Sequence, residues 1–268
     1  MCWFPSGSME KKPRKEEAQR IDSAARFVKW WGADVVMFQE MRDAATCSNL
    51  VARPALAGFK VNVCSQYAPS YRRAPSWQQD AIISRYDAVD AGFLEFERRR
   101  RPAAPPRGMT WAVLDIDGHL HAFVTVHLKS NRSSNWGGPT EEERQANTAK
   151  REEAARQLTA FVKQNLEGKS YKGRRIENVW IGGDFNTSTF DTAFAGEQTI
   201  HTITAAGYRD VFAGVPESDR ATIPQTRNHA AGVFDWLFVK GPAKLSTPSV
   251  APKQPTSDHL LISVFLMP

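Results

Sequence analysis

The chain has 268 residues, 41% of them hydrophobic and 24% charged, with a formal net charge of +6 and a pI of about 9.3. This composition is that of a globular protein long enough for one domain, and the absence of a long apolar run argues against stable membrane insertion. A basic balance favours acidic partners such as nucleic acid, but many basic proteins bind no polyanion, so charge leaves the partner open.

The cysteines are too few for a disulfide framework. They are Cys2, Cys47 and Cys64, and none stands in a zinc-like Cys/His spacing. Cys47 and Cys64 would pair in an oxidising compartment, but two unrelated buried thiols explain them equally well. No secretory signal pattern opens the sequence, and the compartment stays open between cytoplasmic and secreted.

The first part of the chain predicts helices alternating with buried strands. Residues 1–5 are apolar and end in Pro, which is typical of a strand's end before a turn. Helical spacing of apolar residues predicts an amphipathic helix over 16–31, and the run 35–38 predicts a strand buried on both faces. This strand leads into Glu40, whose carboxylate needs solvent, a partner or a cation. A further helix is expected over 41–53.

A basic loop follows the next predicted strands. Strands are expected over 59–63, 81–83 and 89–96. The run Arg98, Arg99, Arg100 and Arg101 then opens a Pro-rich loop that ends at Arg107. A solvated connection and a loop that contacts phosphates both fit this run.

A hairpin and a long helix come next. Residues 110–126 predict two antiparallel strands joined by an Asp117-Gly118 turn, and the second strand leads into His127. A capping box at Thr140 and Glu143 predicts a helix that ends near residue 166.

The run 179–181 predicts a short buried strand that ends in a Gly-Gly-Asp-Phe-Asn motif. Gly182 and Gly183 would allow a tight turn and leave room for something to approach. On an extended chain Asp184 and Asn186 would lie on the same side. Taken alone, the motif is more typical of a turn rich in Asp and Asn than of a catalytic site.

The C-terminal part contains a helix and two predicted strands. The helix is expected over 199–206. The strand over 232–239 carries Asp235 inside it, and a charge in an apolar strand needs a partner. Asp258-His259 precedes a final strand over 260–266.

Polar side chains therefore recur at the ends of apolar strands. Strand ends at one edge of a sheet converge on one crevice. Acids suit a hard divalent cation, and imidazoles suit proton transfer near neutral pH. Carboxylates with two histidines and no cysteine ligand point to Mg²⁺-type phosphoryl chemistry more than to zinc. The residues at strand ends are Glu40, His127, Asp184, Asn186, Asp258 and His259, and Asp235 lies inside a strand.

The sequence resembles the endonuclease/exonuclease/phosphatase superfamily, which has the DNase I-like fold. The resemblance implies one α/β domain over 1–268, a four-layer sandwich of two packed, mostly antiparallel β-sheets flanked by helices. Six matching pieces occur in the family's order: Gln39-Glu40, Ala81-Ile82-Ile83-Ser84-Arg85, His127-Leu128-Lys129-Ser130, Gly182-Gly183-Asp184-Phe185-Asn186, Phe234-Asp235-Trp236 and Ser257-Asp258-His259.

The resemblance also implies a metal and a base. Glu40 would bind the catalytic Mg²⁺ or Mn²⁺, and Asp258 would help to hold it. His259 would act as general base or contact the scissile phosphate, oriented by Asp235. This pairing would explain the acid inside the strand.

Three further residues would act on the phosphate. By resemblance, Asp184 and Asn186 would position the attacking water and the phosphate oxygens. His127 would stabilise the charge that develops in the transition state or protonate the leaving oxygen.

The sequence departs from the family pattern in two places. The family begins with a strand that ends in an Asn at the metal site, whereas this sequence begins where that Asn should have passed, so the domain is expected to lack its first strand. Gln78 stands near the place where some members carry a Glu that supports the first histidine. An amide cannot counter an imidazolium, so His127 would be less basic here.

Three classes of function fit these residues. The first is a metal-dependent nuclease, a monomer acting on DNA or RNA with the Arg98–Arg101 run as substrate-binding residues. The second is a phosphatase or phospholipase acting on inositol phosphates or sphingomyelin-like head groups, which would need an exposed aromatic hairpin such as one at Trp136 for membrane docking. The third is a catalytically impaired binding module. The nuclease is favoured because of the basic charge.

Overall fold

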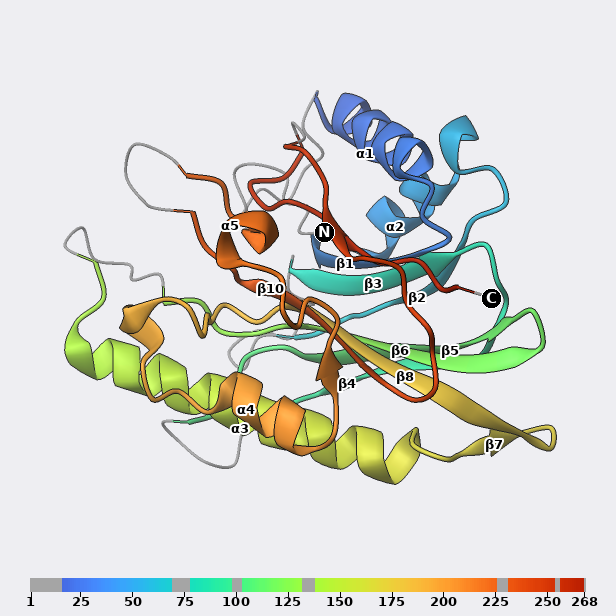
Figure 1. Cartoon of the computed structure of the whole chain (residues 1–268). Coiled ribbons are helices and arrows are strands. Elements are labelled where there is room, and N and C mark those ends of the chain that lie inside the picture. Colours follow the sequence, from blue (N-terminus) through green and yellow to red (C-terminus); the bar gives the residue numbers. More distant parts are fainter. Residues whose placement is uncertain are drawn as a thin grey trace.

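The computed structural model describes residues 16–68, 78–97, 103–131, 138–225, 231–253 and 256–267. In these residues two β-sheets lie face to face and helices cover both outer faces (Figure 1). α1 (Glu17–Trp31) and α2 (Ala44–Val51) cover the smaller sheet, and α3 (Glu141–Asn165) and α4 (Thr199–Ala205) cover the larger one. The predicted four-layer α/β sandwich is therefore confirmed.

The smaller sheet contains three antiparallel strands in the order β1-β3-β2. Val28 of α1 and Leu50 of α2 are buried against its outer face with Phe38. Cys47 of α2 and Cys64 of β2 form a disulfide, with Cα atoms 6.7 Å apart. Of the two alternatives for these cysteines, the structure has the paired one. The elements of this layer beside α1 and α2 are β1 (Val35–Met41), the short 3-10 helix η1 (Pro54–Leu56), β2 (Lys60–Cys64) and β3 (Gln79–Ser84).

The larger sheet has the order β4-β5-β6-β8-β10-β9, with β7 paired to β8. Its pairs are antiparallel except β6 with β8, which run parallel and are joined through α3. The predicted hairpin at Asp117-Gly118 is the β5–β6 turn. Its strands are β4 (Ala88–Glu95), β5 (Gly108–Ile116), β6 (His119–His127), β7 (Ser170–Tyr171), β8 (Arg174–Asp184), β9 (Arg209–Asp210) and β10 (Asp235–Lys240).

Two helix ends follow the signals in the sequence. α1 ends at Gly32, which has the left-handed φ of 73° and whose N–H donates to the Lys29 carbonyl. α3 begins with the predicted capping box, because the Glu143 N–H donates to Thr140 Oγ1 (3.1 Å) and the Thr140 N–H donates to Glu143 Oε2 (2.9 Å). Both bonds satisfy backbone groups that a helix end would otherwise leave unpaired.

A cavity of about 340 Å³ lies between the sheets beside β1. Within the described ranges, β1 lies at one edge of the smaller sheet. The cavity is bordered by the strand's first residues 35–37, by Trp31 and by the C-terminal segment 261–266. Residues 1–15 lie outside the described residues, so the expectation of a missing first strand stays a prediction.

Several predicted strands have different bounds in the structure, and the causes can be seen for three of them. β8 is an eleven-residue strand, longer than predicted, because it pairs along most of its length with β6 and β10. β10 begins at Asp235 and not before it, since the Phe234 and Asp235 N–H groups donate to Thr222 Oγ1. The final strand shortens to β12 (Ile262–Ser263), because its described partner β11 (Ser249–Val250) is equally short. The remaining short elements are η2 (Thr192–Phe194) and α5 (Glu217–Arg220).

Gly183 of β8 is required by the closeness of β6, and not by an approaching ligand as the motif suggested. A Cβ on Gly183 would lie 2.0 Å from the Val126 carbonyl oxygen, and its φ is 141°. A Cβ on Gly182 would lie 2.7 Å from Met37 Cε, the end of a flexible side chain. Gly183→Ala is therefore expected to lower the free energy of unfolding by about 3 kcal/mol or more, and Gly182→Ala by about 1 kcal/mol. Urea denaturation followed by circular dichroism measures both, and equal losses would contradict this explanation.

Candidate active site

Strand register places three of the predicted catalytic side chains in a row. His127 ends β6 and pairs with Asp184, which ends β8, and Asp184 pairs in turn with Asp235 at the start of β10. Directly opposed residues point to the same face of a sheet. The three side chains therefore share one face at one end of the larger sheet, and all three are buried.

Glu40 is placed by a β-bulge in the smaller sheet. The register of β1 against β3 shifts between Phe38 and Met41, which leaves Gln39 and Glu40 opposite the single residue Asp80. Glu40 has a φ of 60°, a left-handed conformation that is uncommon for residues other than glycine but frequent in bulges. Gln39 is fully buried, whereas Glu40 keeps part of its side chain accessible. The bulge thus re-aims Glu40 toward the larger sheet.

The His127 imidazole lies between two carboxylates. Its Nε2 is 3.7 Å from Glu40 Oε1 and 3.5 Å from Asp184 Oδ2. Gln78 donates from Nε2 to the same Glu40 oxygen at 3.4 Å. Gln78, which lies near the place where the resemblance expects a Glu, thus contacts the predicted metal ligand.

Asn186 folds back onto Asp184. Its φ is 51°, so the chain is not extended here as the alternation argument assumed. Its N–H donates to Asp184 Oδ1 (2.8 Å) and its Nδ2 donates to Asp184 Oδ2 (2.9 Å) and to the Leu128 carbonyl (3.2 Å). The motif is therefore an Asx turn, and this same turn brings the acid and the amide together.

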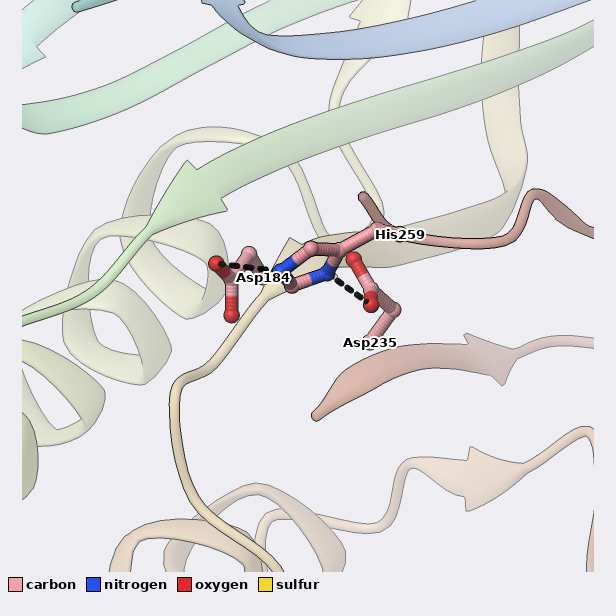
Figure 2. A group of neighbouring side chains, drawn as sticks. All are labelled: Asp184, Asp235 and His259. Carbon is pink, nitrogen blue, oxygen red and sulfur yellow. Dashed lines mark hydrogen bonds and ion pairs between the residues drawn. The ribbon is translucent and has the colours of Figure 1, made fainter. Parts of the chain in front are cut away.

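His259 lies between two carboxylates, as Figure 2 shows. Its Nδ1 is 2.6 Å from Asp235 Oδ2, which confirms the predicted pairing. Its Nε2 is 4.0 Å from Asp184 Oδ2. Because the strong contact is at Nδ1, the ring presents Nε2 toward Asp184.

Arg107 is a part of the site that the sequence did not single out. It has a φ of 61° and precedes β5, at the end of the basic loop. Its Nε donates to the His127 carbonyl (2.7 Å), Nη2 donates to the Leu128 carbonyl (2.6 Å) and Nη1 donates to Gln78 Oε1 (2.8 Å). The guanidinium therefore fixes the segment that carries His127. The sequence signal that could have pointed to it is the Arg107-Gly108 pair. This pair stands at the start of β5, and β5 pairs with β6, the strand that carries His127.

Comparisons with solved structures match nearly the whole chain. An endonuclease/exonuclease/phosphatase family protein from Leptotrichia buccalis is 16% identical, with 96% of each chain covered and a TM-score of 0.63. The mannosyl-6-phosphatase of Bacteroides thetaiotaomicron is 16% identical, with 94% of this chain and 91% of that chain covered and a TM-score of 0.64. TDP2 of D. rerio, complexed with a single-strand DNA product, is 15% identical, with 97% and 95% covered and a TM-score of 0.62. The chain has the DNase I-like fold. The resemblance seen in the sequence is thus confirmed for the fold, whereas no protein-family model and no curated protein matches the chain.

In this DNase I-like fold the candidate site concentrates acids whose charge is poorly compensated. Burial, reinforced by the Asp184 charge, raises the pKa of Glu40 to about 7. Burial raises the pKa of Asp184 to about 6, although the His259 charge opposes the shift. Burial also raises the pKa of Asp80, opposite the bulge, well above its ordinary value. Such groups favour a proton or a cation nearby.

Asp235 behaves differently from the other acids. Burial alone would raise its pKa, but the His259 charge and hydrogen bond hold the pKa of this carboxyl below its ordinary value. Asp235 is therefore an ionised partner of His259, a role typical of a carboxylate that orients an imidazole.

The candidate site offers oxygen and nitrogen donors for a cation. Ligand atoms of Asp184, Asp235 and His259 lie within 4.8 Å of one another. His127 connects Glu40 to this cluster, because its Nε2 lies near the carboxylates of both Glu40 and Asp184. The raised pKa of Glu40 means that its ionised form is disfavoured here, and a bound cation would stabilise that form. Asp258 is exposed beside His259, and its charge contributes to the raised pKa of Glu40. This donor set could hold a metal ion, and its carboxylate oxygens would suit a hard divalent cation.

Other predicted residues fall outside the described ranges. The run Arg98, Arg99, Arg100 and Arg101 lies there, as does Trp136. Their roles in substrate binding and membrane docking stay predictions. No helix in the part of the chain that the structure describes combines the length and the apolar character needed to cross a membrane.

Proposed function

We propose that the protein is a divalent-metal-dependent hydrolase of phosphoric esters, and that its substrate is the phosphodiester backbone of DNA or RNA. The observation that carries this proposal is the continuous chain of contacts from Glu40 through His127 and Asp184 to His259 and Asp235. It joins three acids of differing pKa to two imidazoles at one end of a DNase I-like sandwich. Retention of this whole cluster also argues against a catalytically impaired binding module.

A Mg²⁺ or Mn²⁺ ion held by Glu40 and Asp258 would supply positive charge to the phosphate oxygens. His259, fixed through Nδ1 by Asp235, presents Nε2 to take a proton from water. Asp184 and Asn186, locked together by two hydrogen bonds, position the water and the phosphate.

His127 completes the proposed mechanism on the opposite side of Asp184. Arg107 holds its backbone carbonyl, so the ring is fixed against both neighbouring carboxylates. Between Glu40 and Asp184 the imidazole is well placed to carry a proton and to donate it to the leaving oxygen.

The net charge of +6 supports a polyanionic substrate. The likeness to a TDP2 complex with a DNA product supports a nucleic acid, and the likeness to a mannosyl-6-phosphatase supports the alternative of a small phosphate ester. Inositol phosphates and sphingomyelin-like head groups belong to the same alternative.

A substrate panel tests the proposal. Purified protein with Mg²⁺ or Mn²⁺ is expected to hydrolyse plasmid DNA or RNA, and bis(p-nitrophenyl) phosphate more slowly, since a polyanion gains extra binding energy from a basic surface. Mannose 6-phosphate, inositol phosphates and sphingomyelin complete the panel, and product analysis reports each rate. His259→Ala serves as the inactive reference.

Two results would change the proposal. Faster turnover of a phosphomonoester or a lipid head group than of DNA and RNA would replace the nuclease with the phosphatase or phospholipase alternative. Equal turnover by wild type and His259→Ala would remove this cluster from the reaction altogether.

A further inference from the structure

The segment after β6 is built into the site beyond His127. The Leu128 N–H donates to the Asp184 carbonyl (2.8 Å). The Leu128 carbonyl accepts from Asn186 Nδ2 (3.2 Å) and from Arg107 Nη2 (2.6 Å). Lys129 is the next residue, so its backbone is tied directly to the catalytic cluster.

A buried ion pair between Arg151 of α3 and Glu197 holds the other end of this segment. Arg151 is fully buried, and its Nη1 donates to the Lys129 carbonyl (2.9 Å) and to Asn131 Oδ1 (2.8 Å). Its charge is compensated by the Glu197 carboxylate. Arg151 Nε donates to Glu197 Oε1 (2.8 Å), and Arg151 Nη2 donates to Glu197 Oε2 (2.5 Å). Arg151 therefore positions the segment, and its charge is already neutralised.

The Lys129 ammonium, by contrast, has no carboxylate within ion-pair distance among the described residues. It is half-buried and donates one hydrogen bond, to the Ser130 carbonyl (2.6 Å). Among the charges that act on it most strongly, Arg107, Lys150 and Arg151 are cations and Glu143 is an acid. Burial, reinforced by these cations, lowers its pKa to about 8. An ammonium has three donors, so two remain for a ligand.

We propose that Lys129 forms a second phosphate-binding subsite beside the catalytic cluster, and that this subsite takes the phosphate next to the scissile one in an oligonucleotide. The subsite deepens the proposed function and rests on it for the identity of the scissile group. An anion bound there would give the Lys129 ammonium the ion-pair partner that the described residues do not provide. Substrates with one phosphate would leave the subsite empty.

Binding measured in EDTA tests the subsite without turnover. We expect Lys129→Met to weaken binding of a fluorescein-labelled oligothymidylate about tenfold at low salt, the effect of losing one charge-assisted hydrogen bond. The slope of log affinity against log salt should flatten by roughly one unit. Lys129→Arg, which keeps the charge, should bind nearly as wild type does. Lys163→Met is the matched control, because Lys163 is exposed near the end of the same helix that carries Arg151.

Kinetics separate the subsite from the proposed function. Lys129→Met should raise KM for the oligonucleotide and leave kcat/KM for bis(p-nitrophenyl) phosphate unchanged. Unchanged oligonucleotide affinity in Lys129→Met, or no oligonucleotide binding by wild type, would overturn the subsite. Weaker binding by Lys129→Met in a protein that hydrolyses neither compound would uphold the subsite and refute the hydrolase.

Discussion

Replacing Asp235 by Asn is expected to lower the rate of phosphodiester hydrolysis by about 10²–10⁴-fold, the usual contribution of an oriented proton-transfer group. The Asp235 carboxylate lies 2.6 Å from His259 Nδ1, and its charge favours the protonated ring. The Asn amide has the same shape but no charge, and its NH2 group can donate a hydrogen bond to Nδ1. That bond would favour the tautomer with its proton on Nε2, which could not accept a proton from water there. The loss should therefore fall on kcat more than on KM.

The control is Asp90→Asn. Asp90 is a β4 carboxylate that accepts a hydrogen bond from the Tyr171 hydroxyl (2.5 Å), away from the catalytic cluster. Thermal melts of both variants show whether the fold is kept. A folded Asp235→Asn protein with wild-type kcat would show that the pairing with His259 is structural only.

Removal of divalent metal is expected to abolish activity, and the same metal should stabilise the protein. A cation that binds the folded state alone raises Tm by mass action. Glu40→Gln should lose most of this rise, because Glu40 is the buried acid whose pKa is raised to about 7. Glu177→Gln, which alters an acid paired with His119 at 2.9 Å, should keep it.

The pKa of Glu40 also fixes how this stabilisation depends on pH. The ordinary value is 4.5 and the folded value is about 7, so between them the unfolded chain has released a proton that the folded chain keeps. The metal-free protein therefore loses stability as pH rises through this window. A bound cation offsets that loss, so the rise in Tm with Mn²⁺ should be larger at about pH 7.5 than at about pH 5.5. Full turnover in excess EDTA, or an equal rise in Glu40→Gln, would contradict the metal assignment.

Helix ends and turns could be predicted from the sequence, because each is determined by residues that are close neighbours along the chain. The helical spacing before Gly32, the Asp117-Gly118 turn and the Thr140–Glu143 capping box each act within a few residues, and each appears in the structure. The layers followed from the resemblance and not from these signals. The bounds of β8 and β10 depended on pairing with strands far away in sequence, which no local pattern contains.

The candidate site shows the same division. The polar residues at strand ends could be named from the sequence. The need of Asp235 for a partner was also visible, because a charge in an apolar strand is costly alone, but His259 as that partner came from the resemblance. The bulge that re-aims Glu40 could not be predicted, because it exists only in the register of β1 against β3. Arg107 was missed since its three hydrogen bonds go to groups on two other segments.

The row of His127, Asp184 and Asp235 across three strands has a consequence for how activity is gained during folding. The outer two members of the row are separated by 108 positions (235 − 127), and the parallel pair β6–β8 can close only after α3 has crossed over the sheet. Contacts of such long range form slowly. The chain loses conformational entropy when the long intervening loop closes, before the contact contributes any stabilisation. We therefore expect the complete row, and with it activity, to appear only once β6, β8 and β10 are all paired.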